Sequence, residues 1–447
     1  MHKMVQVRCL CAIIQAMGEE KKSASTYRLR WSSVQHYPTL LRRVLIRAIL
    51  VLFGLQVGVI GVLVAIDIWR KRYRSQGHFP RSRPEPIAVG HSTVQLYTYG
   101  EDLYEAMLQA IRQARERIFF ETFIWKDDLV GQKFKYELQC AANRGVAVYV
   151  MYDAFANLVV PKRFKRFKPN IYVLRYPILA WLRQPFYLSG YARDHRKILV
   201  IDGKIAFVGG YNVGARYATE WRDTHIRIEG HDAHELESVC IDFWNMYRKR
   251  NRSLPVLPEP RERDWDPLIV VHRNDPHMLV FPIRSSYLEA INRANKHIYL
   301  THAYFIPDRI ILQALLQAAA RGVDVRILLP ETSNHILADW LARGLYTQCL
   351  IAGVRLFLYQ NAMVHAKTAT IDGIWSTIGT ANLDRLSMLG NFEVNVEIYD
   401  APLAQQMEEI FSQDSTNARE LTLASWKRRS PLHIFAEMIL SPLRPLL

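Results

Sequence analysis

One spaced pattern of polar residues occurs twice in this chain. The first copy runs from His195 to Asn212 and the second from His365 to Asn382, and both read H-x-K-x4-D-x6-G-x2-N. Two copies so far apart indicate duplication of a whole domain, because solenoid repeats recur at much shorter periods. A chain of 447 residues is long enough for two domains, each with a core of its own.

The same order of apolar and amphipathic stretches precedes both copies. Apolar runs at 114–125 and 144–153 enclose a helical stretch, and runs at 294–305 and 321–330 enclose another. A glycine opens the second run of each pair, as expected where a helix ends and a strand follows. Alternating strands and helices predict the α/β fold class.

Most of the excess positive charge lies near the N-terminus. Lys and Arg number 58 against 42 Asp and Glu, a net charge of +16, and residues 1–85 alone contribute 15 basic and four acidic residues. A nucleic-acid groove needs its charge on the folded body, so this distribution argues against a nucleic-acid partner. The five cysteines are scattered and include no C-x-x-C pair, which argues against a zinc ribbon and a disulfide framework.

An uncharged segment from Ala48 to Ile66 is long enough to cross most of a bilayer and has arginines on both sides. No small-residue cleavage site follows it, so we interpret it as an uncleaved membrane anchor; a buried core helix is the alternative. Because both flanks are basic, the positive-inside rule barely discriminates between the two orientations.

The spacing within the duplicated pattern predicts a phosphate site. A His and a Lys two positions apart on a strand project from one face, and apolar residues then lead to an Asp-Gly hairpin turn. Two histidines, two lysines and two asparagines that converge would offer imidazoles for proton and phosphoryl transfer, cations for charge and amides for oxygens. A single histidine on a strand is more often structural, but the duplication favours a functional role.

These motifs resemble the two H-K-D motifs of the phospholipase D superfamily, over about residues 90–425. The second motif, with the segment from Gly379 to Asn395, is similar to that of bacterial cardiolipin synthases, and so is the segment Trp221–Gly230. The resemblance implies two pseudo-symmetric repeats, each a mixed β-sheet flanked by helices, with the active site between them. Many cardiolipin synthases begin with two membrane spans, whereas this sequence shows one.

The resemblance also implies a mechanism without a metal or other cofactor. A membrane-anchored phosphatidyltransferase would form cardiolipin from phosphatidylglycerol and release glycerol through a phosphohistidine. We expect His195 to be the nucleophile and His365 the general acid and base. We expect Lys197, Lys367, Asn212 and Asn382 to bind the phosphate oxygens, and Asp223 and Glu393 to orient the imidazoles. The motif aspartates, Asp202 and Asp372, are grouped with the catalytic set, although their hairpin position favours a structural role.

Several alternatives remain open at this point. The enzyme could be a phospholipase D that hydrolyses phospholipid to phosphatidic acid or transfers the phosphatidyl group to another alcohol. Nucleic-acid phosphodiesterases share the motifs, and a non-catalytic lipid-binding scaffold is a further class. We expect phospholipid substrates and a membrane as partners, no nucleic acid, and a single-pass protein of the bacterial inner (cell) membrane with its catalytic domain on the cytoplasmic side.

The sequence divides into six predicted regions. They are an N-terminal tail (1–40), a transmembrane anchor with basic flanks (41–74), a linker (75–90), a first repeat (91–262), a second repeat (263–425) and a basic and apolar C-terminal tail (426–447). The tail could lie in the membrane interface or dock on the body.

Overall fold

The computed structural model describes residues 24–73, 78–178, 188–248, 253–258 and 267–446. The chain separates into two compact units, Met1–Ala65 and Ile66–Leu447. Residues 1–23 of the predicted tail lie outside the described part, so the tail can be compared only from residue 24 onward.

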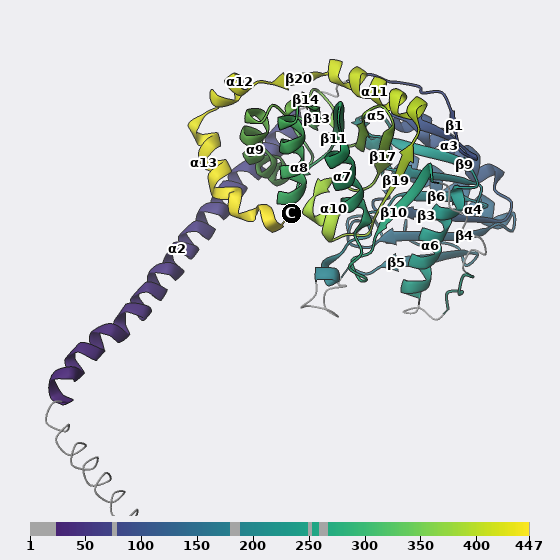
Figure 1. The fold of residues 1–447 in the computed structure, drawn as a ribbon. Coiled ribbons are helices and arrows are strands. Elements are labelled where there is room, and N and C mark those ends of the chain that lie inside the picture. The colour runs from purple at the N-terminus through teal and green to yellow at the C-terminus, as the bar shows by residue number, and fades with distance from the viewer. Residues whose placement is uncertain (1–23, 74–77, 179–187, 249–252, 259–266, 447) are drawn as a thin grey trace, which may run out of the picture. The chain divides into compact units, whose positions relative to one another are not determined.

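The first unit contains most of a long helix, α2 (Ala24–Tyr73), drawn in purple in Figure 1. It begins inside the predicted tail, where the sequence showed no clear pattern. Its segment Leu41–Arg70 is long and apolar enough to cross a membrane. Large apolar side chains such as Leu50 and Phe53 are more than half exposed, as expected of a helix whose solvent is lipid.

The second unit contains two eight-stranded sheets. The first sheet has the strand order β1-β2-β9-β7-β6-β3-β4-β5. Its strands are β1 (Ile87–Val89), β2 (Ser92–Tyr97), β3 (Arg117–Thr122), β4 (Ala147–Asp153), β5 (Ile171–Tyr176), β6 (Ile198–Ile201), β7 (Ile205–Gly209) and β9 (His225–Gly230).

The second sheet has the order β10-β19-β17-β16-β11-β13-β14-β20. Its strands are β10 (Ile269–Asn274), β11 (His297–His302), β13 (Asp324–Pro330), β14 (Arg355–Tyr359), β16 (Lys367–Ile371), β17 (Trp375–Gly379), β19 (Glu393–Tyr399) and β20 (Ala418–Leu421).

The two sheets repeat one topology, which confirms the predicted fold class. In each, three strands run parallel, β3, β4 and β5 in the first and β11, β13 and β14 in the second, and the remaining pairings are antiparallel. Helices join β3 to β4, β11 to β13 and β13 to β14, whereas the described residues 154–170 between β4 and β5 form turns and no helix. The antiparallel hairpins β6–β7 and β16–β17 carry the two copies of the sequence motif.

Helices cover both sheets. They include α3 (Gly100–Gln113), α4 (Leu129–Asn143), α6 (Ala233–Arg248), α7 (Pro282–Arg293), α8 (Arg309–Ala320), α9 (Ile336–Ile351) and α11 (Ala401–Thr416). The crossover helices α4 and α8 begin at Asp128 and Asp308, whose carboxylates accept backbone N–H groups of the first turn. They are followed by Gly145 and Gly322 at φ of 93° and 92°, the left-handed conformation that glycine adopts without strain.

A shared apolar core joins the repeats. It includes Val208 and Ile226 of the first sheet together with Ile378 and Val394 of the second, all fully or almost fully buried. The sheets therefore pack on each other within one unit (Figure 1). This shared core fixes the central strands of the two sheets, and the loops at the ends of these strands, relative to one another.

Two of the predicted regions outside the repeats contain secondary structure of their own. Residues 87–89 of the predicted linker form β1, which pairs with β2, because their apolar side chains extend the sheet. The predicted C-terminal tail contains α13 (Pro431–Leu440), which contacts α9, and the short helix Ser441–Leu446. The boundaries of the six predicted regions stay predictions.

Candidate active site

The two motif histidines lie immediately before the strands of their hairpins. His195 precedes β6 and His365 precedes β16, so both are in extended loop segments rather than inside strands as the spacing predicted. The N–H of His195 donates to the carbonyl oxygen of Phe392 at 3.1 Å, and that of His365 donates to the carbonyl oxygen of Arg222 at 2.6 Å. Each histidine loop is therefore hydrogen-bonded to the opposite repeat.

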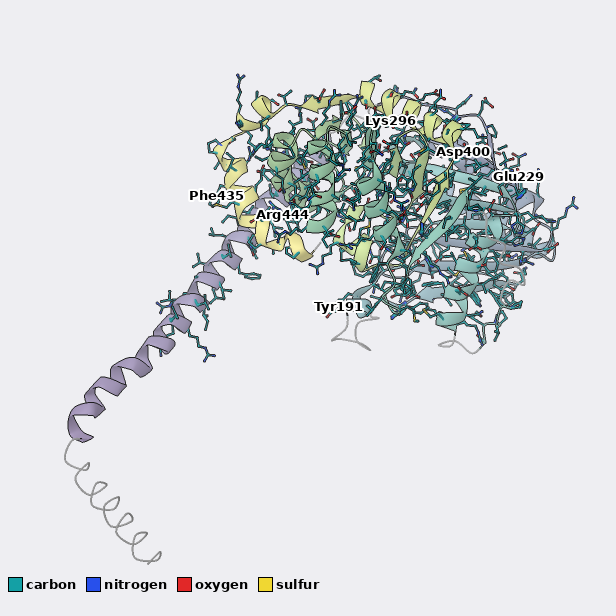
Figure 2. The ribbon with its side chains drawn as sticks, in the orientation of Figure 1. Tyr191, Glu229, Lys296, Asp400, Phe435 and Arg444 are labelled. Atoms are coloured by element: carbon teal, nitrogen blue, oxygen red, sulfur yellow. The ribbon has the colours of Figure 1, made fainter. Side chains whose placement is uncertain are left out.

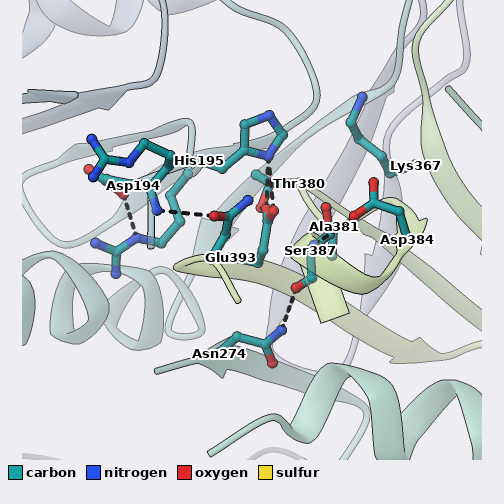
Figure 3. A network of polar contacts seen from close by, with 12 residues as sticks. Asp194, His195, Asn274, Lys367, Thr380, Ala381, Asp384, Ser387 and Glu393 are labelled. Carbon is teal, nitrogen blue, oxygen red and sulfur yellow. Dashed lines mark hydrogen bonds and ion pairs between the residues drawn. The ribbon is translucent and has the colours of Figure 1, made fainter. Parts of the chain in front are cut away.

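The side chains are also paired across the repeats. The Nδ1 atom of His195 lies 3.0 Å from both carboxylate oxygens of Glu393 (Figure 3). In the same way, His365 Nδ1 lies 2.6 Å from Asp223 Oδ2. A carboxylate at Nδ1 places the proton there and leaves Nε2 as the reactive nitrogen of a neutral imidazole. This is the orienting contact that the sequence predicted for Asp223 and Glu393.

Each carboxylate is held by its surroundings in a different way. The Thr380 hydroxyl donates to Glu393, which is fully buried. The equivalent position in the first repeat is Gly210, and a Cβ there would lie 2.0 Å from an oxygen of Asp223. Asp223 therefore occupies the space that a side chain fills in the second repeat. Its Oδ1 also accepts the N–H of Thr224 at 2.8 Å.

Both motif lysines are buried and close to the carboxylates. Burial lowers the pKa of Lys197 to about 7 against the opposing effect of Glu393, and lowers that of Lys367 to about 8 against Asp223. Each ammonium donates to the carbonyl oxygen of the histidine in its own motif. An anionic phosphate beside these ammonium groups would raise both pKa values again, so the two lysines are cations suited to a phosphate.

The imidazoles are neutral at pH 7 when no substrate is bound. Burial is the largest cause, lowering the pKa of His365 to about 3 and also lowering that of His195; the nearby lysines add to it. Burial alone would raise the pKa of Asp223, but Lys367 and His365 outweigh burial and hold it below its usual value. The pair at His365 thus consists of a carboxylate and a neutral imidazole.

The motif asparagines lie beyond the hairpins. Both side chains are 3% exposed. The Oδ1 atom of Asn212 accepts the N–H of Ile124 at 3.1 Å, which turns its amide NH2 group away from that backbone. The Oδ1 atom of Asn382 is buried and has no hydrogen-bond partner among the described residues.

The structure separates Asp202 and Asp372 from the histidines. They lie in the hairpin turns, at φ of 55° and 56°, at the far ends of β6 and β16. Asp202 accepts three backbone N–H groups from residues 115–117, and Asp372 accepts three from residues 295–297. These hydrogen bonds favour the structural role that the hairpin position indicated, and the grouping of both residues with the catalytic set stays a prediction.

Aromatic walls around the imidazoles were not predicted. Phe123 meets the His195 ring edge to face at 4.7 Å, and Trp221 lies 4.9 Å from the His365 ring. Tyr304 meets His365 at 6.4 Å. No contact with a histidine was predicted for any of the three, although Trp221 begins the segment that resembles cardiolipin synthases. Phe123 directly follows β3, Trp221 is the first residue of β8 (Trp221–Arg222), and Tyr304 directly precedes β12 (Phe305–Ile306).

The described residues include no group of three or more His, Cys, Asp or Glu side chains that could hold a metal ion.

Comparison with known proteins identifies the family. The model of the family "Cardiolipin synthase, PLD-like domain" matches residues 107–244 and 287–415. A cardiolipin synthase of Clostridium perfringens is 31% identical over 366 residues, which cover 79% of this chain and 77% of the relative. One of Listeria welshimeri is 31% identical over 371 residues, or 81% and 77% of the two chains.

The fold has a solved counterpart. The crystal structure of a phosphatidylserine synthase of Haemophilus influenzae Rd KW20 superposes with a TM-score of 0.60 and 14% identity, covering 82% of this chain and 95% of that one. This likeness concerns the fold alone. The matched segments contain both histidine motifs, and they confirm the resemblance seen in the sequence. The chain belongs to the cardiolipin synthase family of proteins with phospholipase D-like domains.

Proposed function

We propose that this chain is a phosphatidyltransferase that joins two phosphatidylglycerol molecules into cardiolipin and releases glycerol. The observation that carries the proposal is the crossed pairing of the histidines, His195 with Glu393 and His365 with Asp223. Two oriented imidazoles beside two buried ammonium groups supply a nucleophile, a proton shuttle and charge for a phosphodiester. The cardiolipin synthases among the relatives supply the substrate class.

The reaction proceeds in two displacements. His195 Nε2 attacks the phosphorus of the donor lipid, the P–O bond to the head glycerol breaks, and protonated His365 gives its proton to the leaving oxygen. His365, now neutral, takes the proton of a head hydroxyl of the second lipid, whose oxygen attacks the phosphorus while the P–N bond breaks. Lys197 and Lys367 hold the phosphate oxygens in both steps, with the asparagine amides.

The anionic substrate also prepares the acid. The lysines add to the burial that keeps His365 neutral in the free enzyme. A bound phosphodiester offsets their charge and raises the pKa of the imidazole, so that protonation accompanies substrate binding. The opposite assignment of the two histidines is the second candidate, because their surroundings are related by pseudo-symmetry.

The long apolar helix α2 supports a membrane anchor. We propose a single-pass protein of the bacterial inner membrane, with the catalytic unit on the cytoplasmic side, where the donor and acceptor lipids are both accessible. A cysteine added after Leu446 and labelled with a membrane-impermeant maleimide in spheroplasts and in inverted vesicles would test the side. Labelling in spheroplasts would contradict the cytoplasmic placement.

The activity is tested with the full chain in mixed micelles containing labelled phosphatidylglycerol and no added metal. We expect equal amounts of cardiolipin and glycerol, lost in His195→Ala and His365→Ala but kept in His91→Ala, a control at an exposed turn. Phosphatidic acid as the sole product would show a hydrolase, and another phosphatidyl alcohol would show a different acceptor. Cleavage of nucleic acid without lipid turnover would refute the proposal.

The intermediate is tested separately. In His365→Ala, acid-quenched and base-quenched samples should show a base-stable, acid-labile phosphatidyl adduct on the peptide that contains His195. An adduct on the peptide containing His365, found in His195→Ala, would establish the opposite assignment.

A further inference from the structure

A cavity of about 240 Å³ is lined mainly by residues of the second repeat and the C-terminal tail. Its lining combines cations with large aromatic side chains. The residues that matter here are Arg70, Arg343, Arg419, Trp340, Trp426 and Tyr304. Arg70 comes from the last turns of α2, which belong to the same compact unit as the catalytic repeats.

Tyr304 connects this cavity to the chemistry. Its ring lines the cavity and also meets the ring of His365 edge to face at 6.4 Å. The phenol donates to Asn334 Oδ1, which fixes the ring in this position. One aromatic ring therefore separates the cavity from the catalytic imidazole, so a molecule of lipid-headgroup length can extend from one to the other around its edge.

The cavity has cationic charge that is only partly neutralised. Arg419 pairs with Glu331 at 2.9 Å and Arg343 pairs with Glu437 at 3.3 Å. Arg70 forms no ion pair with any described residue, and its charge acts on His433 in the same lining. Burial raises the pKa of the remaining acid, Asp339, to about 7, so this carboxyl is largely protonated at slightly acidic pH. The lining thus favours an anion.

An exposed apolar helix face lies next to the cavity. His433, which lines it, belongs to α13, and its ring lies 5.2 Å from Trp340. The outer side of α13 exposes Leu432 (76%) and Met438 (61%), and Phe435 lies on the same helix at the edge of the catalytic unit (Figure 2). An amphipathic helix with such a face lies in a membrane interface. This exposed apolar face favours an anion that is carried by a lipid.

The proposed reaction requires a second anionic position. The acceptor phosphatidylglycerol attacks through its head hydroxyl, and its own phosphodiester lies at the other end of a three-carbon glycerol. We propose that this cavity binds the phosphodiester of the acceptor lipid, with Arg70 as its principal cation, while the donor phosphate lies between Lys197 and Lys367. The inference rests on the proposed function, since it names the second substrate of the same site.

Arg70→Gln tests the assignment, and Arg72→Gln is the matched control, because Arg72 is exposed on the same basic flank and does not line the cavity. Two rates are measured in micelles. Cardiolipin formation requires binding of the acceptor lipid and its phosphate. Incorporation of labelled free glycerol into phosphatidylglycerol uses the donor site and both histidines but requires no acceptor phosphate. Losing a hydrogen bond to a charged phosphate should lower the first rate roughly 10-fold at subsaturating lipid.

We expect glycerol exchange to stay unchanged in both variants and cardiolipin formation to fall only in Arg70→Gln. An equal fall of both rates in Arg70→Gln, no change in either, or the same loss in Arg72→Gln would overturn the inference. If the unsubstituted chain exchanges glycerol but forms no cardiolipin, the proposed function is refuted instead.

A binding measurement tests the inference even if the proposed function is refuted. Glycerophosphoglycerol, the deacylated form of both lipids, is titrated by calorimetry into the full chain carrying His195→Ala, which prevents turnover, and Lys197→Gln, which weakens its binding at the donor site. Arg70→Gln should weaken its binding roughly 10-fold, and Arg72→Gln should leave it unchanged. Unchanged binding in Arg70→Gln would overturn the inference. Tight binding of inorganic phosphate that displaces the analogue and depends on Arg70 would show a site for free phosphate and would overturn it too.

Discussion

Gly210 lies so close to Asp223 that an added methyl group would displace the carboxylate. A Cβ at this position would be 2.0 Å from Oδ1 and 2.5 Å from Oδ2 of Asp223. The backbone at Gly210 is not in the left-handed region, so alanine is tolerated there by the main chain itself. Gly210→Ala should therefore displace the carboxylate of Asp223 and disrupt its 2.6 Å contact with His365.

The size of the effect follows from that contact. A hydrogen bond to a charged group contributes about 1.5–3 kcal/mol. If the contact of Asp223 with His365 stabilises the transition state and not the bound substrate, its loss lowers kcat roughly 10- to 150-fold. The assay is cardiolipin formation at saturating phosphatidylglycerol in micelles, normalised to folded protein by circular dichroism. Thr380→Ala is the matched variant of the second repeat. It removes a hydrogen bond to Glu393 but adds no atoms, so we expect a smaller loss.

A double substitution separates this mechanism from general damage. In Asp223→Ala the carboxylate is absent, so adding Gly210→Ala should cost almost nothing further. If Gly210→Ala keeps the full rate, or if its loss multiplies with that of Asp223→Ala, the reasoning from the steric contact is refuted.

Three further outcomes follow from the structure. Asp202→Ala leaves three backbone N–H groups without an acceptor, so the free energy of unfolding in urea should fall by about 2 kcal/mol while kcat per folded molecule is unchanged. Arg222→Met leaves the carboxylate of Asp414 buried without its cation, 2.6 Å away in the native pair, and should cost about 3–5 kcal/mol in the same measurement. The KM for phospholipid should rise as the pH increases from 7 to 9. The cause is that Lys197 and Lys367, with pKa values lowered to about 7 and about 8, lose their protons in that range. In Lys197→Gln only the rise near pH 8, which belongs to Lys367, should remain.

Each of these expectations has a contrary result. A large loss of kcat in folded Asp202→Ala would keep this residue in the catalytic set. Full stability of Arg222→Met would show that Asp414 is neutralised by protonation at little cost. A KM that is constant from pH 7 to 9 would show that neither lysine changes its charge in that range.

The hairpins and the crossover units were predictable from the sequence because their signals are local. Apolar runs, an Asp-Gly turn and a glycine after a helix each act within a few residues, and the structure contains them at Asp202, Gly145 and Gly322. Duplication made the histidines recognisable, since chance does not repeat such spacing. The same local patterns gave no indication of β1 in the linker or of helix in the tail before residue 41, where packing and helix propagation decide.

The sequence by itself determined the family, the two motifs, the apolar anchor and the kinds of groups available for phosphoryl transfer. Only the tertiary structure decided which carboxylate orients which imidazole. His195 is oriented by Glu393 and His365 by Asp223, each from the opposite repeat. The physical reason is that these contacts depend on how two separately folded sheets pack through a shared core, and no spacing along one strand encodes the distance between residues of two sheets.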